Sequence, residues 1–480
     1  MRQKIIIIVI LISVCLITNG QDSRVRLSIV LNSSEKVEVV PASLKYNKDF
    51  AFSFTLDDAL LDAFDLAFRL FNGGLSPVDG ITYPGLYYTD GCGNQIPFTA
   101  SIAWYTANQQ GVDIHNSVNT GHMTWSQALQ LYHSGWTFLN HSYDHSQKGD
   151  DIDYTWQLNQ NNLAFYERMG HYLNHVIPPG GNANYIQPAF DLGALAVFTS
   201  NGSYAQSSGK PIKVDGNITK DNPVFWRHHI NSFDDTVEDL KSQVTELFDS
   251  SGINNHLWWN EFTHRVQYEL YGGSVKFEDF KEYMEYLELS YGAKGNDRGL
   301  FANSIEVFEY LKVRDNVVIH INQNENLLEI ELDYAACPQV MRYYDISLLI
   351  SGADIQTIEA IDAGQVCYSN DTDYSLINIK LPASYFTGTK DLDVSDSSDW
   401  LIYPNPTQDY IIISSEKLFS DDIEISILDF AGRQIPTQVQ SYGATSVRIN
   451  IDKRSTKAGF FLLLAYQNGR IVLNEKIFID

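Results

Sequence analysis

Hydrophobic positions follow a mixed pattern over the first two thirds of the chain. Phe50 to Leu56 is almost wholly apolar, which predicts a buried strand, and the apolar residues from Leu60 to Phe71 recur at helical spacing. Further strands are predicted in WTFLN and HLWWNEFTH. Helices are predicted over 124–135, 156–175, 235–250, 277–291 and 303–312. Strands that alternate with helices indicate a parallel α/β architecture.

After Arg314 the period changes to two, and no helical pattern returns. We therefore expect an α/β domain at 45–314, a β-sandwich module at 315–390 and a second all-β module at 400–480. An acidic, serine-rich linker is predicted at 391–399, and residues 21–44 are predicted to form leading strands. Residues 72–122 are rich in Gly, Tyr, Asn and Thr, which indicates a long, partly irregular insertion.

The first 20 residues have the pattern of a secretory signal peptide. Arg2 and Lys4 precede the apolar run from Ile5 to Ile17, and small residues end the segment. A membrane anchor is the alternative, but the run is shorter than the ~20 residues that span a bilayer. Export permits disulfides, and Cys337 and Cys367 could pair because they lie in one strand-rich region, which would leave Cys92 single.

The chain is strongly acidic, with a formal net charge of −26. Such a surface repels other polyanions, so we expect neither nucleic acid nor an anionic membrane as a partner.

Three predicted strands end in side chains that can carry chemistry. Asp57 and Asp58 follow the first strand, His141 and His145 follow the strand WTFLN, and His264 follows HLWWNEFT. In a parallel α/β barrel the functional side chains lie at these carboxyl ends. One Asp and two His would hold a zinc-like ion with positions open for water and substrate, while a second Asp and another His exchange protons.

Each part of this constellation also has a structural interpretation. Asp57 and Asp58 alone could cap the following helix, and His264 alone could be a buried histidine with its hydrogen bonds satisfied. A second pair at the same spacing, His171 and His175, is interpreted as surface histidines at the end of a polar helix.

In combination, these segments resemble the polysaccharide deacetylase family (NodB-like, carbohydrate esterase family 4) over roughly residues 37–315. FSFTLDDA resembles the family's T-F-D-D-G motif, and HSYDH fits its H-[S/T]-x-x-H motif. The resemblance implies a distorted (β/α) barrel with fewer than eight strands and metal-assisted removal of acetyl groups from a carbohydrate. It implies that Asp58, His141 and His145 bind a divalent metal, expected to be Zn²⁺, with Asp57 as general base and His264 as general acid.

The sequence departs from the family pattern at two points. Ala59 replaces the motif glycine, which is acceptable if the turn needs no positive φ. The stretch from Ile177 to Gly181 lacks the family's arginine, for which Arg227 or Arg265 is a candidate substitute. The expected substrate-binding residues are Pro179, Gly180, Trp258 and Trp259. Backbone N–H groups near Gly180 could stabilise an oxyanion, and the two tryptophans line either a sugar site or the barrel core.

The last 80 residues resemble the C-terminal sorting domain of type IX secretion. The resemblance rests on Tyr403-Pro404-Asn405-Pro406, on Gly432 and on Gly459, within segments of alternating strands. The alternative is an ordinary carbohydrate-binding sandwich. The resemblance implies export to the cell surface or the medium by the type IX machinery.

These observations favour a secreted, metal-dependent deacetylase of an acetylated polysaccharide or oligosaccharide, acting on N-acetyl or O-acetyl groups. Two alternatives stay open: a glycan-binding relative with weak or no activity, and a hydrolase of a non-sugar amide.

Overall fold

The computed structural model describes residues 23–381, except 150, 206–207, 250–255, 270–272 and 362–363, and beyond residue 399 it describes the strands and Ile435. The chain forms two compact units, Met1–Phe386 and Thr387–Asp480. The predicted signal peptide and the predicted linker at 391–399 lie outside the described residues.

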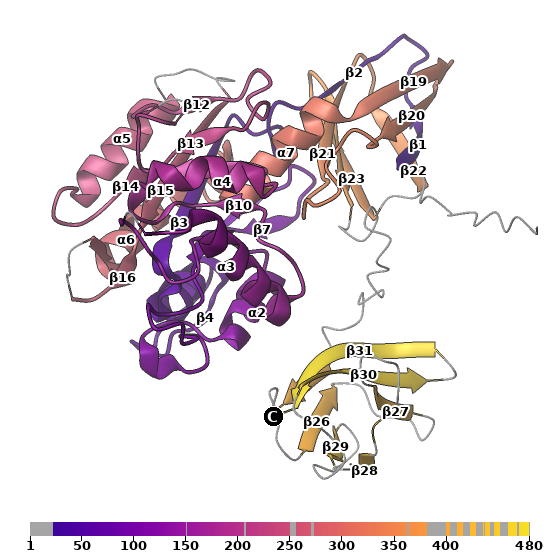
Figure 1. Cartoon of the computed structure of the whole chain (residues 1–480). Helices are drawn as coiled ribbons and strands as arrows, with labels where there is room; N and C mark the ends of the chain where they lie inside the picture. The colour runs from indigo at the N-terminus through magenta and orange to yellow at the C-terminus, as the bar shows by residue number, and fades with distance from the viewer. Residues whose placement is uncertain are drawn as a thin grey trace, which may run out of the picture. The chain divides into compact units, whose positions relative to one another are not determined.

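A ten-stranded sheet forms the centre of the first unit (Figure 1). Its main order is β12-β15-β3-β8-β9-β10-β11-β13, and its pairs are parallel except β12 with β15. The strands are β3 (Phe50–Leu56), β8 (Ser101–Trp104), β9 (Thr137–Asn140), β10 (His175–Val176), β11 (Ala196–Thr199), β12 (Ile212–Lys213), β13 (Val224–Trp226), β14 (His228–His229), β15 (Leu257–Thr263) and β18 (Gly299–Phe301).

The sheet curls, and its two ends meet at Arg227. β13 lies at one end of the order, yet β14, which begins two residues later, pairs in parallel with β15 near the other end. Arg227 is the single residue between β13 and β14. This closure brings a side chain from the far end of the sheet next to the end of β3.

Helices of the first unit cover this sheet (Figure 1). Thr124 and Gln127 form a reciprocal capping box at the start of the helix after residue 124. The predicted helix after Asp58 is a π-helical segment followed by one short α-helix. The elements are η3 (Ala63–Ala67), α1 (Phe68–Asn72), α2 (Trp125–His133), α3 (Tyr154–Met169), α4 (Ile186–Asp191), α5 (Val237–Asp249), α6 (Phe277–Tyr291) and α7 (Ser304–Asn316), with the 3₁₀ turns η1 (Lys45–Asn47), η2 (Asp57–Ala59), η4 (Val118–Thr120), η5 (Pro179–Gly181) and η6 (Ala183–Tyr185).

Small two-stranded ladders complete this part of the unit. They join β4 (Gly74–Leu75) with β5 (Thr82–Tyr83), β6 (Tyr87–Thr89) with β7 (Gln95–Pro97), and β16 (Arg265–Gln267) with β17 (Ser274–Lys276).

Two four-stranded antiparallel sheets share a second core in the first unit. The first has the order β19-β20-β1-β22 and the second the order β2-β21-β24-β23. Leading strands from the N-terminus therefore lie inside sheets built mainly from residues after 317. The strands are β1 (Arg24–Leu31), β2 (Glu38–Pro41), β19 (Val318–Asn324), β20 (Leu327–Asp333), β21 (Ile346–Ser351), β22 (Ile355–Ile361), β23 (Gln365–Asn370) and β24 (Ser375–Lys380).

The disulfide differs from the predicted one. Cys92 pairs with Cys367, whereas Cys337 is buried and free. Sequence spacing suggested a bridge within the β-rich region, but folding brings the insertion at 72–122 against β23. The disulfide therefore links the insertion to one of the antiparallel sheets.

Within the histidine pair, His171 is half-buried and His175 is fully buried, so His175 is not at the surface as predicted. α3 ends at Met169, His171 stacks on Tyr132, and His175 lies in β10 with 1% of its surface exposed. Apolar neighbours, including Phe308, surround the His175 ring.

The second unit contains two antiparallel sheets, β25-β26-β29-β28 and β27-β30-β31, around a small, mainly aliphatic core. Tyr403 ends β25 and Gly459 begins β30, whereas Pro404 to Pro406 and Gly432 lie outside the described residues. The strands are β25 (Trp400–Tyr403), β26 (Tyr410–Ser415), β27 (Ile423–Leu428), β28 (Thr437–Ser441), β29 (Ser446–Ile451), β30 (Gly459–Gln467) and β31 (Arg470–Ile479). Within the described part of the whole chain, no helix has the length and apolar character to cross a membrane.

Candidate metal centre

The turn after β3 holds two adjacent carboxylates in an unusual backbone conformation. Asp58 has φ of 74° and Ala59 has φ of 51°, both in the left-handed region. The turn therefore needs a positive φ at Ala59. Alanine in place of the motif glycine is thus strained at this position. Alanine in this region costs on the order of 1 kcal/mol relative to glycine. The turn directs Asp58 toward the end of β9.

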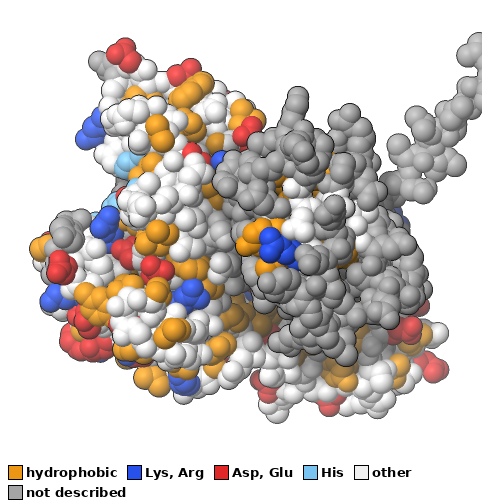
Figure 2. All heavy atoms as spheres, turned by 90° about the horizontal axis from the view of Figure 1, so that it is seen from below, with side chains coloured by type: hydrophobic (Ala, Val, Ile, Leu, Met, Phe, Trp, Pro, Cys, Tyr) orange, Lys and Arg blue, Asp and Glu red, His pale blue; other side chains and the backbone are white. Residues whose placement is uncertain are grey.

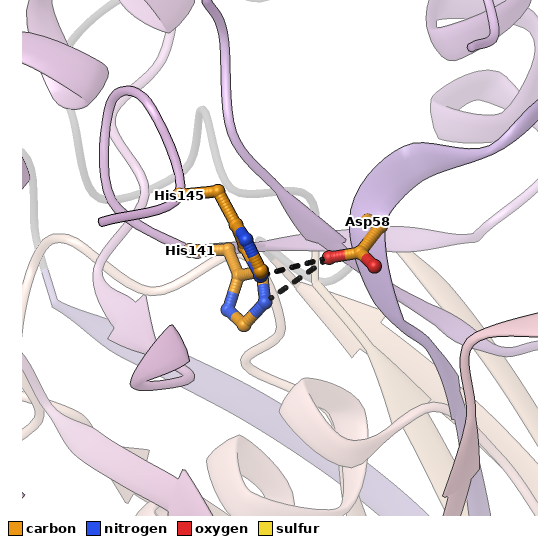
Figure 3. A group of neighbouring side chains, drawn as sticks. All are labelled: Asp58, His141 and His145. Carbon is orange, nitrogen blue, oxygen red and sulfur yellow. Dashed lines mark ion pairs between the residues drawn. The ribbon is translucent and has the colours of Figure 1, made fainter. Parts of the chain in front are cut away.

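His141 and His145 face the Asp58 carboxylate from the loop after β9 (Figure 3). Asp58 Oδ1 lies 3.4 Å from His141 Nε2 and 3.1 Å from His145 Nε2. One ligand atom from each residue lies within 4.8 Å of the other two. His145 adopts φ of 58°, so the loop turns back and brings both imidazoles to the same side. Residues predicted from separate strand ends thus form one group.

The hydrogen bonding of this group fits a bound cation. His141 Nδ1 lies 2.6 Å from the Ile177 carbonyl oxygen, so Nδ1–H donates and the lone pair of Nε2 faces Asp58. Asp58 Oδ1 is buried and has no hydrogen-bond partner among the described residues. One carboxylate oxygen and two imidazole nitrogens are a donor set suited to zinc and related transition metals.

Electrostatics keep Asp58 ionised. Burial on its own raises the pKa of Asp58, but the imidazoles of His141 and His145 outweigh burial and hold that pKa well below its usual range. Burial lowers the pKa of His145, but the Asp58 carboxylate outweighs burial and raises it overall.

Asp57, next to the metal group, forms a buried bidentate pair with Arg227. Arg227 Nη1 donates to Asp57 Oδ1 at 2.8 Å and Nη2 donates to Oδ2 at 3.1 Å. The exposed fractions are 3% for Asp57 and 2% for Arg227, and the guanidinium lies 4.1 Å from the centre of the Phe262 ring. Burial raises the pKa of Asp57, but Arg227 outweighs burial and lowers it overall. Of the two candidate arginines, Arg227 contacts Asp57, whereas Arg265 donates to Gln267.

His264 directly follows β15, just as Asp57 directly follows β3. The two strands pair in parallel, so both residues lie at the same edge of the sheet. Its charge contributes to lowering the pKa of Asp57. His264 Nδ1 is buried without a hydrogen-bond partner among the described residues, and its ring lies 5.3 Å from the ring of His229. Figure 2 shows histidine side chains at the surface of one face, with acidic and basic side chains beside them.

The predicted substrate segment at Pro179 and Gly180 lies beside the histidine loop. Only Pro178 separates it from Ile177, whose carbonyl oxygen accepts a hydrogen bond from His141 Nδ1–H. Gly180 is exposed, with φ of 57°, and Pro179 is buried. Asn182 Nδ2 donates to the Gln147 carbonyl oxygen at 2.7 Å, which ties this segment to the loop.

The two tryptophans belong to the core, which corrects their assignment to a sugar site. Trp258 is 0% exposed and Trp259 is 2% exposed. Both indole N–H groups are bonded internally, to Ser53 Oγ at 3.0 Å and to Glu261 Oε1 at 2.8 Å. A substrate cannot stack on rings that are packed on both faces.

Sequence reasoning assigned no role to Tyr105 or His122, yet both lie near the metal group. Tyr105 directly follows β8, and its ring centre lies 5.1 Å from that of His145. Tyr105 Oη lies 2.8 Å from His122 Nε2. The sequence signal was the position of Tyr105 after a short apolar strand, which the irregular composition of residues 72–122 obscured.

Comparisons with known proteins identify one segment by family. Residues 401–480 match the secretion system C-terminal sorting domain. This domain indicates export by type IX secretion to the cell surface or the extracellular space. No curated protein matches the chain.

Two solved structures resemble parts of the fold. One is a Streptococcus pyogenes deacetylase, PplD, in complex with acetate, with 16% identity and a TM-score of 0.23 over 31% of this chain and 55% of that chain. The other is the endo-fucoidan hydrolase MfFcnA9 from glycoside hydrolase family 107, with 9% identity and a TM-score of 0.28 over 91% of this chain and 98% of that chain. The first match thus spans little more than half of its counterpart. These scores are too low to carry a functional argument, which rests on the residues themselves.

Proposed function

We propose that this protein is a secreted, metal-dependent deacetylase that hydrolyses N-acetyl or O-acetyl groups of a polysaccharide or oligosaccharide. The observation that carries the proposal is the convergence of Asp58, His141 and His145 beside the buried pair of Asp57 and Arg227. The curled parallel sheet, with these side chains after its strand ends, supports a barrel of the polysaccharide deacetylase type.

The metal group would hold a zinc ion through Asp58, His141 and His145. Such an ion, when bound, supplies Lewis-acid chemistry: it polarises a substrate carbonyl and makes water more acidic. The Ile177 carbonyl oxygen supports this role because it fixes the His141 tautomer that offers Nε2.

Asp57 would accept the proton of the attacking water. Arg227 keeps the carboxylate ionised and fixes its plane with two hydrogen bonds, so the base is oriented before substrate arrives. His264 would donate a proton to the leaving amine or alcohol. A backbone N–H group near Gly180 would stabilise the negative oxygen that develops on the acetyl carbon.

The Asp57–Arg227 pair bears on the alternative of an inactive glycan-binding relative. The stretch at 177–181 lacks the arginine of the family pattern, which favours that alternative. The guanidinium of Arg227, which comes from the far end of the sheet, contacts the Asp57 carboxylate. The missing arginine therefore no longer favours the inactive relative.

The decisive experiment measures acetate release from N-acetylated chitooligosaccharides and from O-acetylated xylooligosaccharides. We expect release from at least one glycan, loss of release with a chelator, and recovery with added zinc. Asp57→Asn should abolish release while zinc stays bound, whereas Asp333→Asn, at the end of β20, should change neither.

Zinc binding without acetate release from either glycan would support the glycan-binding relative. Release of acetate only from a non-sugar acetamide would support the third alternative, a hydrolase of other amides.

A further inference from the structure

Tyr105 and His122 form a polar pair next to the metal group. β8 lies between β3 and β9 in the sheet, so the residue that follows it emerges between the strand ends that carry Asp58 and His141. Tyr105 is that residue, and its side chain is partly exposed. Its ring centre is 5.1 Å from that of His145, and its hydroxyl oxygen is 2.8 Å from His122 Nε2.

The contacts of His122 determine the direction of the hydrogen bond between the two side chains. His122 Nδ1 lies 3.0 Å from the Thr120 carbonyl oxygen, which can only accept, so Nδ1 carries the proton. Nε2 of the neutral ring can then only accept, and the Tyr105 hydroxyl must donate to it. Burial lowers the pKa of His122, which favours this neutral form at neutral pH. The Tyr105 oxygen is therefore left as a hydrogen-bond acceptor.

The backbone around His122 is joined to the turn that carries Asp58. Leu60 and His122 form an antiparallel bridge. On either side of it, Leu61 N–H donates to the Gly121 carbonyl oxygen and Met123 N–H donates to the Ala59 carbonyl oxygen, each at 3.0 Å. His122 is thus held in a fixed place relative to the metal group.

We propose that Tyr105 is a substrate-binding residue and that His122 is its positioning residue. The Tyr105 oxygen accepts a hydrogen bond from a donor beside the acetyl group that is removed. Two donors share this chemistry, the amide N–H of an N-acetylated sugar and a hydroxyl adjacent to an O-acetylated position. This inference rests on the proposed deacetylase function and adds a determinant of substrate choice.

The test compares Tyr105→Phe with the wild type on N-acetylated chitooligosaccharides and O-acetylated xylooligosaccharides. The phenylalanine keeps the ring against His145 and removes only the oxygen. We expect kcat/KM to fall about tenfold, the effect of losing one hydrogen bond of ~1.4 kcal/mol, while zinc affinity changes less than about twofold. A loss on chitooligosaccharides alone identifies the amide N–H as the donor, and a loss on xylooligosaccharides identifies a hydroxyl.

The control variant is Tyr83→Phe. Tyr83 lies in the same insertion and donates to Asp79 Oδ2 at 2.7 Å, so it loses a comparable hydroxyl away from the metal group. Its kcat/KM should equal that of the wild type.

His122→Phe separates positioning from structure. If His122 acts only through Tyr105, kcat/KM of the double variant Tyr105→Phe/His122→Phe should be no lower than that of Tyr105→Phe alone. The oxygen that His122 orients is already missing in Tyr105→Phe. Additive losses in the double variant would contradict the positioning role.

The outcomes distinguish the inference from the function on which it rests. A wild type that releases acetate, with Tyr105→Phe equally active on both glycans, overturns the inference alone, and so does loss of zinc binding in Tyr105→Phe. A wild type that releases no acetate from either glycan removes both.

Discussion

Replacement of Arg227 by methionine tests the electrostatic argument at the centre of the site. The substitution keeps an unbranched apolar side chain but removes the guanidinium that lies over Phe262, and it leaves the Asp57 carboxylate buried without its bidentate partner. Both side chains are almost fully buried, so water cannot take over the lost hydrogen bonds. Removal of one member of a buried ion pair costs about 3–5 kcal/mol of unfolding free energy.

The expected loss of unfolding free energy in Arg227→Met can be measured by urea denaturation. With a urea dependence of ~3 kcal/mol per molar, a loss of about 3–5 kcal/mol lowers the urea midpoint by roughly 1–1.7 M. Far-ultraviolet circular dichroism of metal-free protein gives the midpoint without a contribution from zinc. Arg227→Lys should fall between wild type and Arg227→Met, because lysine restores the charge but not the two-armed contact.

A double-mutant cycle shows whether the loss comes from the pair itself. Asp57→Asn combined with Arg227→Met should be more stable than the sum of the single effects predicts, because neither side chain is then charged. Arg265→Met controls for the loss of an arginine nearby that does not contact Asp57. An Arg227→Met midpoint within about 0.3 M of wild type, equivalent to less than about 1 kcal/mol, would refute the reasoning.

Three further predictions concern metal, disulfide and pH. His141→Ala should weaken zinc binding at least about 100-fold in isothermal titration, and unchanged affinity would remove His141 from the ligand set. Cys92→Ser should lower the free energy of unfolding by about 2–5 kcal/mol, because the bond to Cys367 closes a long loop, and an unchanged urea midpoint would contradict this. Burial raises the pKa of Glu309 to about 8, so between pH 5 and 8 the folded chain holds a proton that the unfolded chain releases. Stability should therefore fall by about 1.4 kcal/mol per pH unit as pH rises, and Glu309→Gln should remove that slope in urea titrations at several pH values.

Local sequence patterns predicted several elements closely. β3 and α6 have the bounds expected from the apolar run at 50–56 and from the helical spacing at 277–291. The pattern was least informative in the insertion at 72–122, where β8 is only four residues long. A four-residue strand has too few positions to show a period, although its parallel neighbours on both sides stabilise it.

The grouping of the candidate metal ligands Asp58, His141 and His145 was predicted because these residues follow strand ends. Asp57, Asp58, His141 and His145 each lie directly after a strand or in its following loop, so a parallel sheet is enough to bring them to one edge. Trp258 and Trp259 show the limit of this reasoning, because residues within the strand face the core whatever their chemistry.

The amino-acid sequence alone determined the order of strands and helices, the acidic surface and the residue types that can bind a metal, because these depend on local spacing and composition. Only the tertiary structure decided which distant groups meet. Arg227 reaches Asp57 because the sheet curls until β14 pairs with β15, and Cys92 reaches Cys367 because an insertion folds against a sheet 275 residues away in sequence. Such contacts depend on the path of the whole backbone, and no local period or motif encodes that path.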